Sequence, residues 1–332
     1  MIARVAESCY WLMRYMERCS TTSRLLRVQS GMVLDTVIPA SRTWLPLLTV
    51  SGERPSFEER YGKRAVSDGD KVVDHLTWDD TTAASIFSSL RYARENARTV
   101  RETISLEMWN SINAFWLWMR SRRARNMFKS DREAFFDEVN DRCHLFQGIA
   151  QDTMLHEEAF DFMLLGRYLE RAGQTARILD LHHHALGGKV SAPTEAVEGA
   201  EWIAILRTRY AYEPFFKKRR SSLGGPAVAE FMIQEASFPN SVAHAVTRAQ
   251  DCLTRIRPAN SQIGRRSADA LARLRSAVVG LDVERAIDGA IHDVLTHIVD
   301  HTAEISRAIS EEYFYAVFPE QEVEESSAVT EA

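Results

Sequence analysis

The residues LMRYMERCSTTSRLL (Leu12 to Leu26) recur in altered form as LGRYLERAGQTARIL (Leu165 to Leu179). At a constant offset of 153 residues, the identical positions include Leu, Arg, Tyr, Glu, Arg, Thr and Arg in that order. Apolar residues in both stretches follow one another at spacings of three, four and seven, which is the period of an amphipathic helix. The sequence therefore predicts two equivalent helices in different parts of the chain.

Each predicted helix carries a polar stripe opposite its apolar face. At about 100° per residue, Glu17 and Arg18 project within about 60° of Arg14, while Leu12 and Met16 project to the other side. His156 projects onto the second stripe if that helix extends so far back. The stripes supply candidate binding residues and two candidate catalytic carboxylates, namely Arg14, Arg18, Arg24, Arg167, Arg171 and Arg177, with Glu17 and Glu170.

Three interpretations of the stripes stay open. They could be solvated faces, in which exposed pairs contribute only a few tenths of a kcal/mol. They could be buried internal struts, because buried charges must be paired. They could form a site, since three Arg and one Glu in each stripe suit a carboxylate or phosphate ligand. The site interpretation is preferred because both copies keep the same types of polar residue.

The rest of the chain indicates an all-α, multi-helix bundle. Helical periodicity covers most of it, and strand-like alternation is nearly absent. We predict one helical domain over residues 1–318, which could divide into halves 1–187 and 193–318, and a disordered acidic tail over 319–332. Residues 50–78 are rich in Gly and mixed charges and are predicted to be a long connection or small excursion. The remaining predicted helices include 81–105, which would begin with Asp79 and Asp80 as its cap, 106–119 and 283–315.

Composition excludes several classes of protein. With 45% hydrophobic and 26% charged residues, the chain is an ordinary globular sequence, and 15 Gly and 9 Pro are few for a sandwich or barrel. The net charge of -5 makes nucleic-acid binding unlikely as a function. No apolar run is long enough to predict a membrane span. The four Cys show no metal-binding or disulfide spacing, so we expect a reducing, cytoplasmic location.

Other polar motifs in the sequence do not support a metal site or a catalytic triad. His182-His183-His184 cannot all ligate one ion on a helix, because consecutive residues point about 100° apart. His156-Glu157-Glu158 lacks the second His of a zinc-binding helix. No nucleophilic triad stands out either. The sequence thus predicts no metal site and no cofactor.

Three segments together resemble the alpha-E family of bacterial all-helical proteins, which is named for a Glu-Arg motif. They are RVAESCYWLMRYMERCSTTSRLL (Arg4 to Leu26), ARENAR (Ala93 to Arg98) and FMLLGRYLERAGQTARILD (Phe162 to Asp180). The second segment adds Arg94, Glu95 and Arg98 to the candidate binding residues.

The resemblance implies a biochemical context. Alpha-E proteins are typically encoded beside, or fused to, a circularly permuted ATP-grasp protein, often with a transglutaminase-like protease nearby. ATP-grasp enzymes activate a carboxylate as an acyl phosphate and join it to an amine. The resemblance therefore implies a helical partner of an amide or peptide ligase, which binds a carboxylate- or phosphate-bearing peptide intermediate or docks the ligase. In this hypothesis Arg14, Arg18, Arg167 and Arg171 hold the anion.

Two alternatives accompany that hypothesis. The protein could itself transfer or hydrolyse an acyl group, with Glu17 or Glu170 as acid or base if burial raised its pKa. It could also be a scaffold whose stripes are struts. Two segments depart from the family pattern: Thr82-Ala83-Ala84-Ser85-Ile86 replaces an Asn-Pro-x-Ser-Ile-like segment, and Phe238-Pro239-Asn240-Ser241-Val242 lacks the usual Arg. These departures predict a changed ligand or a mainly structural role.

Overall fold

The computed structural model describes residues 2–35, 40–186, 195–219, 223–257, 262–287 and 291–315, and these ranges contain helices and no strand. The predicted all-α fold is confirmed. The predicted tail, 319–332, lies outside the described residues. The first helices are α1 (Ala3–Asp35), α2 (Ala40–Val50), α3 (Arg54–Tyr61), the short η1 (Lys63–Ser67), α4 (Gly69–Trp78), α5 (Ile86–Thr99), α6 (Leu106–Met119), α7 (Arg122–Ser130) and α8 (Arg132–Thr153). The second set is α9 (Glu158–Leu186), α10 (Glu195–Thr208), α11 (Tyr212–Lys218), α12 (Gly225–Gln234), α13 (Val242–Ile256), α14 (Arg265–Val279), α15 (Val283–Ile287), α16 (Ile291–Ile309) and η2 (Ser310–Phe314).

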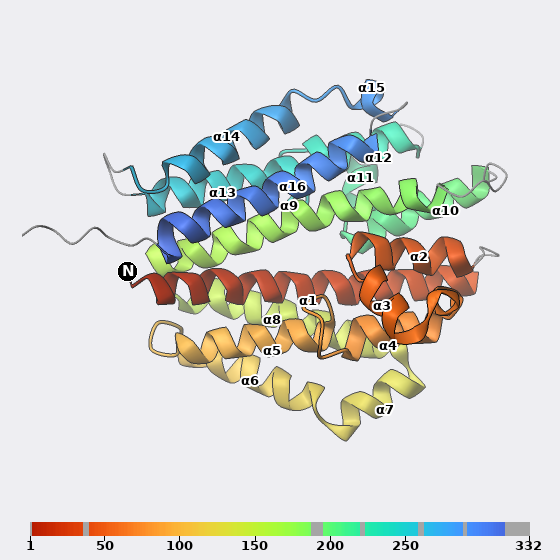
Figure 1. Cartoon of the computed structure of the whole chain (residues 1–332), viewed down its shortest axis with the longest axis horizontal. Coiled ribbons are helices and arrows are strands. Elements are labelled where there is room, and N and C mark those ends of the chain that lie inside the picture. Colours follow the sequence, from red (N-terminus) through yellow and green to blue (C-terminus); the bar gives the residue numbers. More distant parts are fainter. Residues whose placement is uncertain are drawn as a thin grey trace, which may run out of the picture.

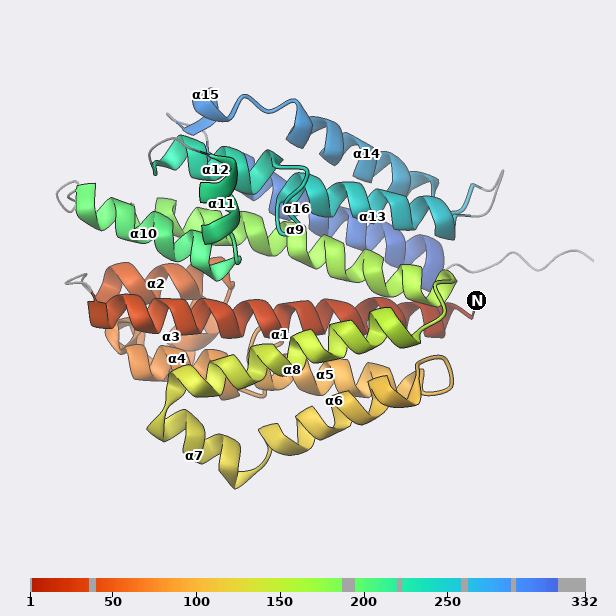
Figure 2. The ribbon, with the colours of Figure 1, turned by 180° about the vertical axis from the view of Figure 1, so that it is seen from behind.

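Two long helices, α1 and α9, lie side by side through the middle of the molecule (Figures 1 and 2). They run in the same direction, because their contacts keep a nearly constant offset: Gly166 meets Tyr10, and Glu170 meets Arg14. A Cβ added to Gly166 would lie 2.2 Å from the backbone oxygen of Tyr10. Glycine at this position therefore allows the close approach of the two backbones.

The other helices form two groups around this pair. On one side α5 and α8 pack against α1, and α6 covers both of them. On the other side α13 and α16 pack against α9, and α14 covers both (Figure 1). The two groups thus pack in the same order along the chain. In the first group α5, α6 and α8 follow α1, and in the second α13, α14 and α16 follow α9. The predicted halves, 1–187 and 193–318, stay a prediction.

Serine caps begin matching helices in the two groups. Ser85 accepts a hydrogen bond from the backbone N–H of Ser88 at the start of α5, and Ser241 accepts one from His244 at the start of α13. Such caps satisfy backbone donors that the first helical turn leaves free. Each serine also donates to a carbonyl six residues upstream, Asp79 and Glu235 respectively. The segments that precede α5 and α13 are therefore held in the same way.

Several helix predictions need correction. The stretch 50–78 is not a simple connection, because it contains α3, η1 and α4. Pro55 lies in the first turn of α3, Gly62 ends it with a φ of 83°, and Asp68 caps α4. Asp79 and Asp80 do not cap a helix at 81; the next helix, α5, begins at Ile86 after Ser85. The predicted helix 106–119 matches α6. Within 283–315 the structure describes α15, α16 and η2, and residues 288–290 lie outside the described ranges.

A continuous hydrophobic core joins both groups of helices. Its largest fully buried side chains include Tyr10, Phe115, Phe136, Phe162 and Phe231. Each buried side chain of this size contributes roughly 1.5–3 kcal/mol relative to exposure. Within the described ranges, no helix is both long and apolar enough to span a membrane.

Candidate functional site

The polar stripes of α1 and α9 face each other, and their charges pair across the helix contact. Glu170 of α9 binds Arg14 and Arg18 of α1, and Glu17 of α1 binds Arg167 and Arg171 of α9. The pairing is reciprocal, because each Glu contacts the two Arg residues that flank the equivalent Glu in the other copy. The solvated-face interpretation is therefore wrong for these residues.

The first network surrounds Glu17, which is 4% exposed. Arg171 donates two hydrogen bonds of 2.8 Å to its carboxylate, one from Nε and one from Nη2. A third cation, Arg209, follows α10 and lies 3.6 Å from Glu17 Oε1. Arg209 also donates to Thr21 Oγ1 at 2.9 Å and to Asn240 Oδ1 at 3.2 Å. We call these residues the Glu17 network.

The second network surrounds Glu170, which is 3% exposed. Arg14 donates to Glu170 Oε2 from Nε at 3.0 Å and from Nη2 at 2.8 Å, and Arg18 Nε donates to Oε1 at 2.7 Å. Arg14 also bonds to Ser306 of α16 and to the Tyr10 hydroxyl. Gln174 donates to Glu170 Oε1 at 3.0 Å. We call this set the Glu170 network.

Both buried carboxylates are held in the ionised form. Burial alone would raise their pKa, but the neighbouring Arg residues outweigh it. The pKa of Glu17 falls to about 2, chiefly through Arg171, and that of Glu170 is also well below its ordinary value, through Arg18 and Arg14. A general acid needs a raised pKa, so the condition that we set for acid–base catalysis is not met. The catalytic role of the two residues stays a prediction.

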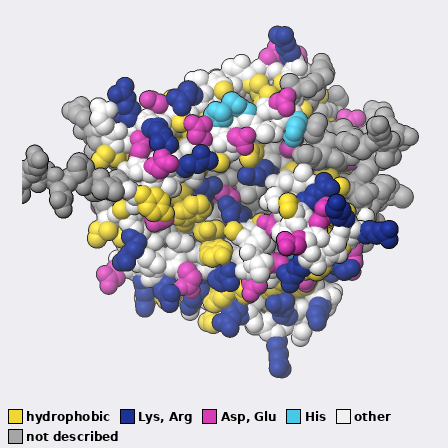
Figure 3. Space-filling model, in the orientation of Figure 1, with side chains coloured by type: hydrophobic (Ala, Val, Ile, Leu, Met, Phe, Trp, Pro, Cys, Tyr) yellow, Lys and Arg dark blue, Asp and Glu magenta, His cyan; other side chains and the backbone are white. Residues whose placement is uncertain are grey.

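A cavity of about 290 Å³ opens beside the Glu170 network. Arg14, Arg18, Glu170 and Arg177 line it from α1 and α9, and Thr302 lines it from α16. The turn after α2 contributes Ser51 and Glu53, and the segment before α5 contributes Ala83 and Ala84. The Arg18 side chain is 20% exposed. In the orientation of Figure 1, Figure 3 shows basic and acidic side chains gathered in the middle of this face, between a hydrophobic patch and the region of α2 to α4.

Arg177 differs from the other Arg residues of the stripes, because it has no hydrogen-bond or ion-pair partner among the described residues. It lines the cavity but makes no hydrogen bond or ion pair with any residue that the structure describes. Burial lowers its pKa, and Glu170 offsets this only in part. Its equivalent in the repeat, Arg24, instead donates to the carbonyl of Arg207 at 3.0 Å and lies 4.3 Å above the Tyr210 ring. The two copies therefore differ at this position.

A family model described as a predicted alpha-helical domain with a conserved ER motif matches residues 1–314. The chain belongs to the Alpha-E family. In this Alpha-E chain, Glu17-Arg18 and Glu170-Arg171 are the Glu-Arg pairs at the contact of α1 and α9. No curated protein and no solved structure matches the chain in the corresponding comparisons.

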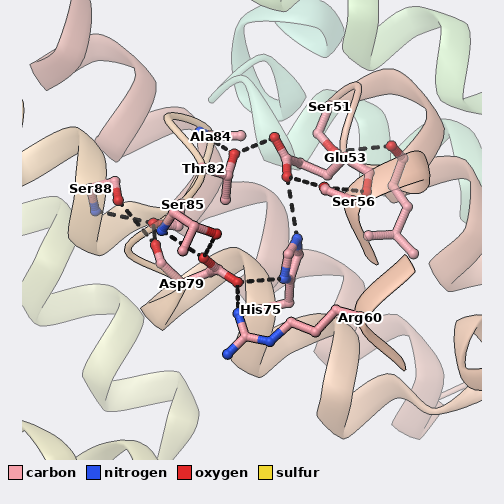
Figure 4. A network of polar contacts seen from close by, with 12 residues as sticks. Ser51, Glu53, Ser56, Arg60, His75, Asp79, Thr82, Ala84, Ser85 and Ser88 are labelled. Atoms are coloured by element: carbon pink, nitrogen blue, oxygen red, sulfur yellow. Dashed lines mark hydrogen bonds and ion pairs between the residues drawn. The ribbon is translucent and has the colours of Figure 1, made fainter. Parts of the chain in front are cut away.

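A further polar network of the Alpha-E chain lies behind one wall of the cavity (Figure 4). His75 of α4 stands between two carboxylates: its Nε2 is 3.3 Å from Glu53 Oε2 and its Nδ1 is 3.1 Å from Asp79 Oδ2. Arg60 pairs with Asp79 on the far side of the imidazole. Thr82 and Ser56 donate hydrogen bonds to Glu53. Glu53 is therefore fixed in the cavity wall from several directions.

The segments that depart from the family pattern both contact the long helices. Thr22 of α1 donates to the carbonyl of Ala84 at 3.4 Å, and its repeat equivalent Thr175 donates to the carbonyl of Asn240 at 2.9 Å. Asn240, at the position where the family resemblance leads us to expect Arg, also donates to the carbonyl of Arg209 at 3.1 Å. The segment Thr82 to Ile86 lines the cavity, and the segment Phe238 to Val242 accepts hydrogen bonds from Arg171 and Arg209 of the Glu17 network.

Some predicted site residues lie elsewhere. His156 precedes α9, is exposed, bonds to Gln151 and stacks on Phe160, so its predicted place in the stripe is wrong. Arg94, Glu95 and Arg98 form their own cluster on α5, in which Glu95 pairs with both Arg residues. The side chains of His182 to His184 lie outside the described residues, and within the described ones no cluster of His, Cys, Asp or Glu could hold a metal ion.

Sequence reasoning missed Arg209, Glu53 and Ser306. None of them lies in the repeated motif, and each reaches the networks or the cavity from a helix or turn distant in sequence. The sequence held a local signal for Glu53 alone, because Gly52 (φ 77°) can adopt the left-handed turn that precedes it; Tyr210 (φ 56°), beside Arg209, gave no such signal, since left-handed backbone is rare for tyrosine. Such turns often position functional side chains.

Proposed function

We propose that this protein is a helical partner of an ATP-grasp-type amide or peptide ligase and that it binds a carboxylate- or phosphate-bearing intermediate in the cavity beside Glu170. The ligase, and a transglutaminase-like protein as a further component, come from the family resemblance. The anionic ligand is supported by the cavity itself, which Arg14, Arg18 and Arg177 line.

The unpartnered Arg177 carries the proposal. Arg14 and Arg18 are already engaged by Glu170, so they add positive potential but few free donors. Arg177 has its full set of guanidinium donors and no partner within the described residues. The Arg177 side chain is half-buried at the cavity, where a carboxylate or phosphate could accept two hydrogen bonds from its guanidinium group.

The repeat supplies a matched control for a binding test. We expect Arg177→Gln to weaken the binding of inorganic phosphate and of succinate about tenfold in isothermal titration, because one charge-assisted contact is lost. Arg24→Gln removes the equivalent cation from the other copy and should change either affinity less than twofold. Equal effects of the two substitutions, or no binding of either anion at millimolar concentrations, would overturn the anion site.

The ligase partner is tested separately. Co-expression with the ATP-grasp-type protein that the family resemblance leads us to expect beside this gene should give a complex that co-elutes in size-exclusion chromatography at micromolar concentrations. An Arg94→Ala, Arg98→Ala double variant tests whether the α5 cluster contributes to docking, because these side chains lie away from the cavity lining. Separate elution of the two wild-type proteins would remove the partner from the proposal and leave the anion site standing.

A structural role of the stripes is the second candidate. The reciprocal, buried ion pairs favour it, since each Glu holds at least two Arg residues at the contact of the two longest helices. Anion binding and a structural role are compatible, because different networks can serve them. The Glu17 network acts as a strut, and the Glu170 network both joins the helices and lines the cavity.

A further inference from the structure

We infer that the ligand of this cavity is a zwitterion, namely an amino acid or a dipeptide-sized group whose carboxylate lies against Arg177 and whose ammonium group lies against Glu53. The inference rests on the proposed anion site and adds the chemistry of the second end of the ligand. It follows from the position, the partners and the orientation of Glu53.

Two carboxylates line the cavity, and Glu53 is the one that binds no Arg among the described residues. It comes from the turn between α2 and α3, whereas Glu170 and the Arg residues come from α1 and α9. The Glu53 carboxylate and the guanidinium groups therefore lie on different walls of the same space. A ligand that carried only negative charge would be repelled by one of these walls.

The partners of Glu53 differ from those of the other carboxylates near the helix pair. Glu17 and Glu170 each bind at least two Arg residues. Glu53 receives hydrogen bonds from Thr82 and Ser56, and His75 is its one ion-pair partner within the described ranges. A carboxylate offers about four acceptor positions, so one remains for a donor in the cavity.

The surroundings also orient Glu53 and keep it charged. Its Oε2 is held by His75 and Ser56, and its Oε1 by Thr82 (Figure 4). Burial raises the pKa of Glu53, but the hydrogen bonds from His75, Thr82 and Ser56 outweigh it, so that the pKa is lowered. An oriented, ionised carboxylate is the group that binds an ammonium ion through a charge-assisted hydrogen bond.

The volume sets the size of the ligand. A buried cavity of about 150 Å³ accommodates benzene, which has six non-hydrogen atoms. The present cavity of about 290 Å³ is roughly twice as large and suits about twelve such atoms. An amino acid with a modest side chain or a small dipeptide has this size, and both carry an ammonium and a carboxylate group a few bonds apart.

The test compares two pools of probe molecules on the intact protein. An equimolar pool of dipeptides and the same pool after N-acetylation, which removes the ammonium charge, are equilibrated with the protein, and bound species are counted by mass spectrometry. We expect the free dipeptides that bind best to be retained about tenfold more than their acetylated forms. In Glu53→Gln this preference should fall below twofold, whereas it should persist in Glu59→Gln, which changes an exposed carboxylate on α3.

The outcomes separate the two levels of the proposal. Equal retention of free and acetylated dipeptides by the wild-type protein overturns the zwitterion inference and leaves the anion site intact. Retention of neither pool, together with failure of the phosphate and succinate titrations, overturns both. The wild-type comparison needs no variant, so it decides the matter even if Glu53→Gln fails to fold.

Discussion

The Glu17 and Glu170 networks are built from equivalent residues of the repeat, yet one is filled and the other is open. Around Glu17, Arg209 and Asn240 occupy the space beside the ion pairs. Around Glu170, the corresponding space is a cavity with Glu53 in its wall. The two distinguishing residues occupy equivalent places in the chain. Arg209 follows α10, the next helix after α9, and Glu53 follows α2, the next helix after α1.

This difference shows how a repeated motif can serve two purposes. Glu-Arg ion pairs join α1 and α9 in both networks. What varies is the side chain that the surrounding helices add. A third buried cation completes the Glu17 network, and burial lowers the pKa of Arg209 to about 10 against the opposing effect of Glu17. Beside the Glu170 network, the further cation is Arg177, which lines the cavity and has no hydrogen-bond or ion-pair partner among the described residues.

The largest expected effect compares the two carboxylates. Glu17→Gln should lower the free energy of unfolding by about 3–5 kcal/mol, because it leaves buried Arg residues without their counter-charge. Glu170→Gln should cost less, since Arg14 and Arg18 line a cavity that water can enter. Urea unfolding followed by circular dichroism measures both. Equal losses, or the larger loss in Glu170→Gln, would contradict the distinction between a filled and an open network.

An effect of intermediate size is expected from acid. The pKa of Glu17 falls from 4.5 to about 2 on folding, so its contribution to stability is complete above about pH 5 and is lost as the pH falls toward 2. The lost contribution is about 2–3 kcal/mol. In Glu17→Gln the dependence of unfolding free energy on pH between 5 and 3 should flatten. The same slope in the variant and in the wild-type protein would show that Glu17 is not held ionised by its Arg partners.

The smallest effect on stability is expected at Gly173, and it should be seen mainly in binding. A Cβ added there would lie 3.0 Å from Thr302 Oγ1 and 3.2 Å from Arg177 Nη1. Gly173→Ala should change the free energy of unfolding by less than about 1 kcal/mol, because the gain in helix propensity opposes the tight contacts. It should weaken phosphate binding several-fold by crowding Arg177.

Gly148 of α8 provides the control for this substitution. Nothing lies within 4 Å of a Cβ added at Gly148, so Gly148→Ala should stabilise the protein by about 0.5–1 kcal/mol and leave phosphate binding unchanged. If Gly173→Ala binds phosphate as the wild-type protein does, Arg177 is not part of the binding surface. The pair thus separates helix propensity from crowding of the cavity.

The sequence predicted the helix contact better than it predicted the cavity. The shared polar stripe indicated that α1 and α9 are equivalent, and the structure brings candidate residues of the two stripes together, with each Glu paired to Arg residues of the other helix. The pairing across the helices could be anticipated because buried charges need counter-charges. The same reasoning could not choose between strut and site, since it contained no information on what surrounds each pair.

The residues that make the networks different were beyond the reach of sequence patterns. Arg209 and Glu53 approach from turns whose positions depend on how α10 and α2 pack against the long helices. The stretch that contains Glu53 is predicted from its Gly residues and mixed charges to be a long connection or small excursion, although Pro55 and Gly62 mark the start and end of α3. The prediction that His156 lies on the second stripe was wrong for a related reason, because the helix boundary was misplaced: α9 begins two residues after His156.

The parallel course of α1 and α9 gives one polypeptide the internal geometry of a symmetric homodimer. In a homodimer of identical subunits, every side chain on one side of the axis must reappear on the other. Here the two sides are encoded separately, so Arg209 fills one of them and Glu53 borders the other. Among the described residues, the contact of α1 and α9 therefore has the cavity beside one Glu-Arg network and a filled space beside the other, whereas a symmetric dimer of half-length chains would have to form two such cavities or none.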